Sequence, residues 1–256
     1  MLSALPTLLV LILPSTQATT NILYYDPDTN QERIAVVSAL FNKYLERAAP
    51  GVMFEPIASE QALQRRIGDP AAKFAIVKST YLRQNKDKLI PLLVPEGGGS
   101  IYYHKVLVDS GDGPPMRLAN KTIAAAMNGD EAKGLLAYLK SQVLEVDGAF
   151  VVSVTKDVDA LLAMTFGQAD AALVTEHSIA VLKQSNPTAV TKLRVLLHTG
   201  DILRAPLCEI AQRASAGERA AMVKTLASLQ DDTAGKRLLD LLGADRWLPY
   251  TPGMLK

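Results

Sequence analysis

The sequence predicts an α/β protein of two lobes, each a mainly parallel sheet flanked by helices. Short apolar strands alternate with helical patterns in residues 21–84, and the same alternation returns in residues 122–184. The turn-rich segment DSGDGPP (109–115) separates the two stretches. Strand-like segments near 102–107 and 199–206 are expected to cross between the lobes. Two hinge strands of this kind would leave the carboxyl ends of both sheets facing one cleft.

The elements of the first lobe follow from apolar periodicity and from the turn residues that end each run. A β-rich run at residues 21–25 stops at Asp26-Pro27-Asp28. Apolar residues at helical spacing predict an amphipathic helix over residues 31–48. The other expected elements are a strand at 52–57, a helix at 59–67 capped by Ser59, a strand at 74–77 followed by a short helix, and strands at 89–94 and 100–108 on either side of a flexible glycine run at 96–99.

The second lobe is expected to alternate in the same way before the chain returns to the first. Its predicted strands are 122–127, 149–154, 169–174 and 193–198, and its predicted helices are 131–142, 158–166 and 177–184. A strand at 203–210 leads back, and two helices joined near Asp231-Asp232 occupy 216–242. The predicted divisions are a signal peptide at 1–18, lobe one at 19–103 and 204–256, and lobe two at 104–203.

Composition excludes several classes of function. The chain has 256 residues, 48% of them hydrophobic and 21% charged, which indicates a globular protein with a sizeable core. Lys and Arg total 27 against 26 Asp and Glu, and without a long basic run nucleic acid is not an expected partner. Cys208 is the only cysteine, so internal disulfides and cysteine-based zinc sites are excluded.

The N-terminal stretch MLSALPTLLVLILPSTQA resembles a secretory signal peptide. An apolar core at 8–13 precedes Thr16 and Ala18, which place small residues at the cleavage-defining positions. The stretch carries no Lys or Arg, and it is too short to span a bilayer as a permanent helix. We therefore expect a soluble periplasmic protein whose mature chain begins near Thr19. The alternatives are a buried first strand or an incorrectly assigned start.

Three segments occur in a characteristic order: VDALLAMTFGQADAALVTEHSIAVL (158–182), KLRVLLHTGDILRAPLCEI (192–210) and ASLQDDTAGKRLLDLLGADRWLPYT (227–251). The strongest local features are a Gly-x-Ala-Asp-Ala unit with a following strand and Glu at 167–176, and a leucine-rich tail at 226–243. This pattern resembles the phosphate/phosphite/phosphonate-type substrate-binding proteins of ABC importers, which have the type 2 periplasmic-binding fold. The resemblance implies capture of a small ligand in the cleft by hinge closure, followed by delivery to an ABC permease.

The resemblance places an anion-binding turn at AMNGDEAKG (126–134), where the family has hydroxyl residues at a helix N-terminus. Here Asn128 precedes Asp130 and Glu131, so two carboxylates stand where hydroxyls are expected. Such carboxylates favour the helix dipole by roughly 0.3–1 kcal/mol each, but they would repel a bound dianion. The alternative is a turn whose Asn and acids only cap the helix.

Three further positions bear on the ligand. Asp157 matches a family His that helps to hold the anion, and Glu176 matches a ligand-facing Glu. Ala205, beside Arg204, stands where aminophosphonate binders have an acidic residue that holds the ligand amine. The fold pattern is retained while the anion-binding pattern is not. We therefore expect a ligand other than simple phosphate or phosphonate, with an amine, a metal-bearing group or largely neutral polarity.

The remaining candidates lie at strand ends. Tyr25 ends the first strand beside Tyr24, and because strand pleating alternates side chains only one of the two is expected to face the cleft. Hydroxyls after the third strand can donate to a ligand or, alternatively, cap a helix. Arg204 can bind a carboxylate or phosphate in bidentate fashion, or form an ion pair with Asp201 or another interlobe acid instead. The predicted ligand-binding residues are Tyr25, Ser79, Thr80, Tyr81, Asn128, Asp130, Asp157, Glu176, His177 and Arg204.

Neither a metal, a cofactor nor catalysis is predicted. His104, His177 and His198 lack paired metal-ligand spacing, although His177 with nearby acids could assemble a metal site in three dimensions. His104 and His198 are expected near the hinge. The chain has no Ser-His-Asp elbow, P-loop, G-x-G-x-x-G after a strand or zinc motif, so an enzyme is not expected. The expected chain is a monomer with a permease partner; the alternative is a sensor or accessory protein that presents its ligand-bound state to a membrane signalling partner.

Overall fold

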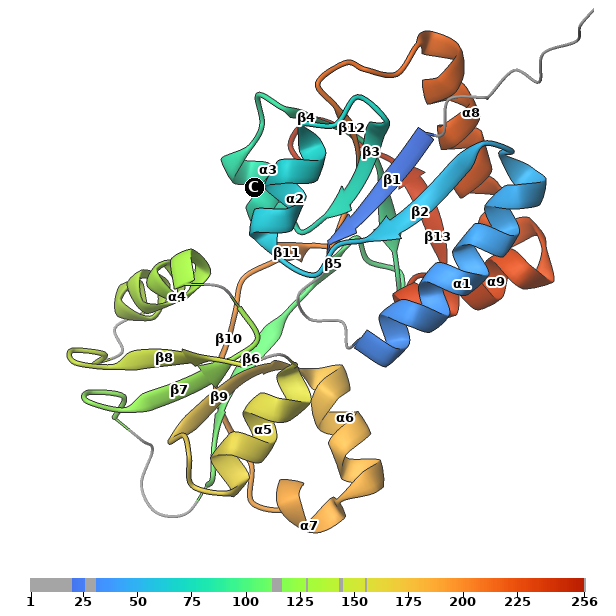
Figure 1. The fold of residues 1–256 in the computed structure, drawn as a ribbon. Helices are drawn as coiled ribbons and strands as arrows, with labels where there is room; N and C mark the ends of the chain where they lie inside the picture. The colour runs from blue at the N-terminus through green and yellow to red at the C-terminus, as the bar shows by residue number, and fades with distance from the viewer. Residues whose placement is uncertain are drawn as a thin grey trace, which may run out of the picture.

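The computed structural model consists of two α/β lobes connected by a short two-stranded ladder (Figure 1). It describes residues 20–25, 31–111, 117–127, 129–142, 145–154 and 156–255, with only the backbone of 31–33 and 129–131. Lobe one contains a six-stranded sheet and lobe two a five-stranded sheet. The two-lobed α/β class predicted from the sequence is confirmed. The predicted signal peptide at 1–18 lies outside the described residues.

The sheet of lobe one has the order β13-β4-β12-β3-β1-β2. The first strands pair in parallel, β1 with both β2 and β3, as expected for a β-α-β arrangement. β12 and β13 come from the far end of the chain and pair antiparallel, so this sheet is mixed rather than mainly parallel. The strands are β1 (Thr20–Tyr25), β2 (Val52–Pro56), β3 (Ala72–Val77), β4 (Leu89–Glu96), β12 (Leu207–Ile210) and β13 (Arg246–Pro249).

Helices cover both faces of this sheet (Figure 1). On one face, α1 (Gln31–Ala48), α8 (Ala216–Ala227) and α9 (Thr233–Leu242) enclose a core that includes Phe41 and Phe54. On the other, α2 (Glu60–Ile67) and α3 (Ser79–Gln84) pack over the side chains that the pleat sends the opposite way. The predicted cap is confirmed, because the Ser59 hydroxyl accepts the Ala62 N–H at 3.2 Å. A 3₁₀ turn, η1 (Ser228–Asp231), joins α8 to α9.

Lobe two has the strand order β10-β6-β9-β7-β8. β7 pairs in parallel with β8 and β9, whereas β6 is antiparallel to β9 and β10. α5 and α6 contribute to the core on one face and α4 to the core on the other. The elements are β6 (Lys105–Asp109), β7 (Thr122–Ala125), α4 (Gly129–Ser141), β8 (Phe150–Ser153), α5 (Asp157–Thr165), β9 (Ala171–Thr175), α6 (Glu176–Ser185), α7 (Pro187–Val190) and β10 (Arg194–His198).

The chain crosses between the lobes twice, and the two crossings pair with each other. β5 (Tyr102–Tyr103) and β11 (Ile202–Leu203) form an antiparallel ladder. The expected strand at 100–108 is therefore divided at His104 into β5 and β6, and the one at 203–210 is divided into β11 and β12. The sequence patterns did not predict α7 or the edge strand β13. Within the described ranges, none of the helices combines the length and apolar character needed to cross a bilayer.

Candidate functional site

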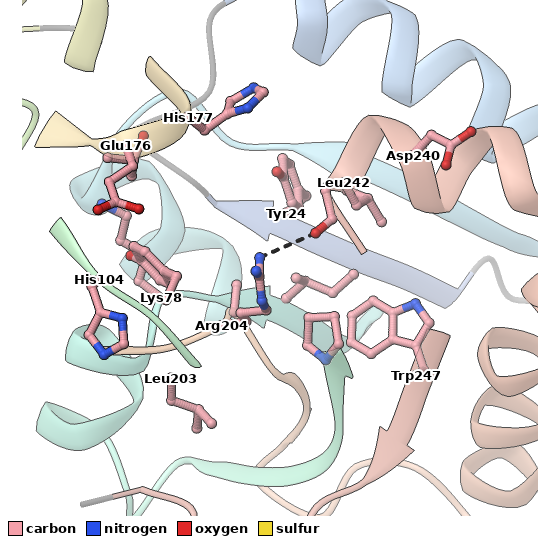
Figure 2. Close-up of a pocket in the computed structure, with 16 residues that line it drawn as sticks. Tyr24, Lys78, His104, Glu176, His177, Leu203, Arg204, Asp240, Leu242 and Trp247 are labelled. Atoms are coloured by element: carbon pink, nitrogen blue, oxygen red, sulfur yellow. Dashed lines mark hydrogen bonds between the residues drawn. The ribbon is translucent and has the colours of Figure 1, made fainter. Parts of the chain in front are cut away.

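A cavity of about 560 Å³ lies between the two lobes (Figure 2). Strand ends of lobe one supply Tyr24 and Lys78, and the beginning of α6 in lobe two supplies Glu176 and His177. The crossing segments and the end of α9 complete the wall. The other lining residues are Ile76, Pro95, Tyr103, His104, Thr175, Leu203, Arg204, Ala205, Asp240, Leu242, Gly243 and Trp247.

A second cavity of about 440 Å³ adjoins the first. The two share Lys78 and Tyr103, so they are neighbouring parts of one interlobe cleft. The second part is bounded by α3 in lobe one, by α4 and the residues after β7 in lobe two, and by the chain just before β11. Its other lining residues are Ser79, Thr80, Arg83, Gln84, Lys105, Ala126, Met127, Gly134, Leu135, Tyr138, Leu173, Thr199, Gly200, Asp201 and Ile202.

Arg204 lies in the middle of the first cavity's wall, directly after β11 (Figure 2). Its guanidinium donates to three backbone carbonyls, each at 3.2 Å: Nε to Ser100, Nη1 to Gly243 and Nη2 to Gly97. In the part of the chain that the structure describes, no carboxylate forms an ion pair with it. Burial lowers the pKa of Arg204, but a guanidinium remains charged at neutral pH. Neutral hydrogen-bond partners therefore hold the guanidinium in place at the cleft, and the charge of Asp245 also acts on it.

The position of the Arg204 guanidinium depends on the glycine turn between β4 and β5. Gly97 and Ser100 exchange backbone hydrogen bonds of 3.0 and 3.3 Å, which fixes two of the three carbonyls. A Cβ at Gly97 would lie 2.4 Å from the Gly243 oxygen and 3.2 Å from the Arg204 Cζ. Only glycine leaves room for this approach. The run predicted to be flexible is thus a defined turn that carries the guanidinium.

The lobe-two wall of the first cavity is formed by the start of α6. Thr175 caps this helix, with its hydroxyl accepting the Ser178 N–H at 3.2 Å. The Glu176 side chain is 74% exposed, and its Oε1 lies 3.9 Å from Nδ1 of His198. An exposed carboxylate and the neighbouring His177 are suited to binding an amine or hydroxyl of a ligand.

The predicted alternative of an ion pair between Arg204 and Asp201 is wrong, because Asp201 contacts His104 and the Arg204 guanidinium donates to backbone carbonyls. Asp201 Oδ1 lies 2.8 Å from Nε2 of His104, between the two crossing segments. His104 itself separates β5 from β6 and lines the first cavity, and His198 ends β10. Among the described residues, no group of three or more His, Cys, Asp or Glu is placed to hold a metal ion.

Asp157 is placed differently from its prediction as a ligand-facing residue. It begins α5, and its side chain is 6% exposed. The carboxylate accepts from Lys105 Nζ at 3.0 Å and from the Thr175 N–H at 2.7 Å. Of the two cavities described, Asp157 lines neither. Sequence spacing could not reveal this contact, because Lys105 and Asp157 are 52 positions apart.

Tyr25 and Tyr81 also need correction, because these two described residues line neither cavity. Their rings meet edge to face with centroids 6.3 Å apart, in the core beneath α2 and α3. Burial raises the pKa of Tyr81 to about 12. Tyr24, one residue earlier on β1, points the other way and lines the first cavity. One tyrosine of the pair faces the cleft, as expected, but it is Tyr24 rather than the predicted Tyr25.

The other predicted residues fall into two groups. Ser79 and Thr80 begin α3 and line the second cavity. Asn128 lies outside the described residues, and of Asp130 the structure describes only the backbone, in the first turn of α4. The acidic turn therefore stays a prediction, although Ala126 and Met127 just before it line the second cavity.

Sequence reasoning overlooked several lining residues. Lys78 directly follows β3, so the rule that ligands bind at the carboxyl ends of strands could have identified it. Asp240, Leu242 and Trp247 come from α9 and β13. The pattern there indicated only a helix, and nothing in it signalled that the end of the chain reaches the cleft.

Two lobes on separate sheets, two paired crossings and a cleft between the lobes define the class of two-lobed solute-binding proteins. The chain belongs to the ABC transporter, phosphonate, periplasmic substrate-binding protein family, whose model matches residues 21–254. The recognised resemblance is thereby confirmed. Members of this family are substrate-binding components of transporters rather than enzymes. No curated protein sequence matches the chain.

Solved structures of low sequence identity share the fold. PhnD1 from Prochlorococcus marinus, in complex with methylphosphonate, is similar with a TM-score of 0.74 and 13% identity, over 94% of this chain and 95% of that one. A binding protein component of an ABC phosphonate transporter from Pseudomonas aeruginosa has a TM-score of 0.70 and 13% identity, over 93% and 83%. A Xanthomonas citri protein bound to ATP has a TM-score of 0.70 and 12% identity, over 93% of both. These likenesses concern the fold alone.

Proposed function

We propose that this protein is a periplasmic solute-binding component that captures a small zwitterionic ligand in the interlobe cleft and delivers it to an ABC permease. The main support for this proposal is Arg204. Its guanidinium lies in the cavity wall and is held by three neutral carbonyls. A guanidinium has five N–H donors, and two remain after these three bonds. These two donors, one on each Nη, can bind the oxygens of a carboxylate or other oxyanion.

The polarity of the cavity favours a ligand that carries both charges. Arg204 and Lys78 belong to the lobe-one side, and Glu176 lies at the start of α6 on the lobe-two side. In Figure 2, Glu176, His104 and Lys78 lie to one side of Arg204, and Trp247 lies on the other. An acidic group at Arg204 and an amine at Glu176 would satisfy both walls. Inorganic phosphate and simple alkylphosphonates lack the amine and would meet Glu176 as a like charge.

Capture of such a ligand would favour the closed arrangement of the lobes. A molecule that binds lobe one through Arg204 and lobe two through Glu176 makes its full set of contacts only when both walls are near it. Its differential affinity then shifts the population toward closure about β5 and β11. The closed form would be what the permease recognises. Presentation of that form to a signalling partner is the alternative, and membership of a transporter family favours the permease.

The test is a thermal-shift screen followed by calorimetry on the mature chain, unfolded and refolded to remove any carried-over ligand. α-Amino acids and aminophosphonates are compared with phosphate and methylphosphonate, since a true ligand raises the unfolding midpoint by mass action. We expect a zwitterion to bind. Arg204→Met should lower the affinity for it roughly 100-fold, because the charged hydrogen bonds to its acidic group are lost.

Arg213→Met is the matched control. Arg213 also donates to two backbone carbonyls, Asp69 at 2.8 Å and Ala72 at 3.2 Å, but of the described cavities it lines neither. It should leave ligand affinity unchanged. Micromolar phosphate or methylphosphonate binding that survives Arg204→Met would contradict the proposed ligand class.

A further inference from the structure

A buried polar cluster in lobe two forms the part of the cleft wall between the two cavities. Lys105 begins β6 and pairs in register with Thr175 at the end of β9. Asp157, at the start of α5, reaches both residues with its carboxylate. Thr175 lines the first cavity and Lys105 lines the second. The Asp157 cluster, as we call these residues with Ser178, is therefore adjacent to the ligand site from both sides.

The donors around Asp157 are those that bind an oxyanion. Its Oδ1 accepts from Lys105 Nζ at 3.0 Å, and its Oδ2 accepts from the Thr175 N–H at 2.7 Å. The Ser178 hydroxyl lies 3.5 Å from Oδ2 and 2.8 Å from the Thr175 hydroxyl. An ammonium, a backbone N–H at a helix start and a hydroxyl together recognise phosphate-type groups.

Burial strongly favours an anion beside the Lys105 ammonium. The Lys105 side chain is 5% exposed and that of Asp157 6% exposed. An ammonium in such a position requires a compensating negative charge, which either the chain or a ligand must provide. Here the chain provides it, and a dianion that reached this wall would meet the carboxylate instead of the ammonium.

We propose that Asp157 is a specificity-determining residue: an internal carboxylate that occupies the oxyanion position of lobe two and excludes phosphate-type dianions from it. This inference rests on the proposed function, because it assumes that the ligand binds in the interlobe cleft. It assigns the acidic group of the ligand to Arg204 in lobe one. Lobe two then receives the neutral or cationic end of the ligand.

The experiment replaces Asp157 and measures whether inorganic phosphate takes its place. Asp157→Ala removes the carboxylate and leaves the Lys105 ammonium, the Thr175 N–H and the Ser178 hydroxyl. We expect phosphate to raise the unfolding midpoint of this variant and to bind it roughly tenfold or more tightly than the wild type. The double variant Asp157→Ala/Lys105→Met should lose that gain, because the ammonium is gone.

Asp109→Ala is the control for a general effect of removing a buried carboxylate from an ion pair. Asp109 is fully buried on β6 and binds Arg194 Nη2 at 2.5 Å and the Gly111 N–H at 2.9 Å, yet of the described cavities it lines neither. Phosphate should stabilise Asp109→Ala less than Asp157→Ala. Equal stabilisation of the two variants, or no gain in a folded Asp157→Ala, would overturn the proposal.

Asp157→Ser gives the same measurement if Asp157→Ala fails to refold, since a small polar side chain remains at the start of α5. If neither variant refolds in buffer alone, recovery in millimolar phosphate but not in chloride of equal ionic strength supports the proposal, and failure in both overturns it. The outcome is separable from the proposed function. A phosphate gain without any zwitterion binding by the wild type contradicts only the ligand class, whereas zwitterion binding without a phosphate gain overturns only the role of Asp157.

Discussion

The two walls of the cleft hold a cation in opposite ways. In lobe one, Arg204 is fixed by the carbonyl oxygens of Gly97, Ser100 and Gly243. In lobe two, Lys105 is fixed by the carboxylate of Asp157. Carbonyl dipoles orient a cation without cancelling its charge, whereas a carboxylate cancels it. The difference indicates that the lobe-one wall retains positive charge for the acidic group of a ligand, whereas the ammonium of Lys105 in the lobe-two wall is neutralised by Asp157.

The largest expected effect comes from breaking the lobe-two pair. Lys105→Met leaves the buried Asp157 carboxylate without its cation, which should lower the free energy of unfolding by about 3–5 kcal/mol. Lys105→Met/Asp157→Leu should recover most of that loss, because an apolar pair of similar volume is often as stable as a buried ion pair. Urea denaturation measures the free energy of unfolding of the single and the double variant. The contrast between the walls would be wrong if Arg204→Met, which removes bonds to neutral carbonyls only, destabilised the protein more than Lys105→Met.

A smaller effect is expected from the turn that carries Arg204. Gly97→Ala introduces a Cβ 2.4 Å from the Gly243 oxygen, so the turn or the end of α9 must shift. We expect a loss of about 1–3 kcal/mol in the free energy of unfolding, together with weaker binding of the ligand that depends on Arg204.

Gly217→Ala is the matched control in the first turn of α8. Apart from its chain neighbours and the backbone of its own helix, no described atom would lie within 4 Å of its new Cβ. It should be neutral or stabilising by up to about 1 kcal/mol, since alanine is preferred over glycine in a helix. Ligand affinity that is equal in the two glycine variants would mean that the turn does not position the guanidinium.

The smallest effect is expected at a partly exposed ion pair that lines neither of the described cavities, and it serves as a reference for the buried pair. Glu218 Oε1 lies 2.5 Å from Lys73 Nζ and its side chain is 39% exposed. The Lys73 contact and the Ser215 N–H lower the pKa of Glu218 to about 2. Because the folded-state pKa lies below the ordinary value, this stabilisation is complete above the ordinary pKa and is lost as the pH falls toward 2.

Glu218→Gln removes the charge and retains an oxygen for the Ser215 N–H. We expect it to cost at most about 1 kcal/mol near neutral pH, because solvent screens the pair. The difference from wild type should shrink through the acidic range in denaturant titrations at several pH values. A cost at neutral pH as large as that of Lys105→Met would show that burial does not distinguish the two pairs.

The sequence predicted the elements with strong periodicity and misjudged those set by long-range contacts. The helix expected over 31–48 is α1 with the same bounds, since its apolar spacing is regular. The strand expected at 100–108 is interrupted at His104, because the chain leaves one sheet and enters the other there. β13 is an edge strand at the end of the chain, and its pairing with β4 is decided by residues about 150 positions away.

Predicted site residues line the cleft where the order and direction of the strands alone decide their position. Glu176, His177 and Arg204 line the first cavity because residues after strand ends meet at one edge. The choice between Tyr24 and Tyr25 depends on the pleat, which composition does not reveal. The placement of Asp157 depends on an ion pair with a distant strand. Contacts between distant residues, rather than local propensity, decided these two cases.

The strand order also has a consequence for the sequence of folding events. Every strand of the lobe-two sheet lies between Lys105 and His198, so that sheet can form from contiguous chain. In lobe one, the central strand β3 pairs with β12, where Ile76 faces Leu207 across a loop that contains all of lobe two. Closing such a long loop is entropically slow. The lobe that begins the chain should therefore be the last to complete its core, and until β12 arrives β3 presents an open edge.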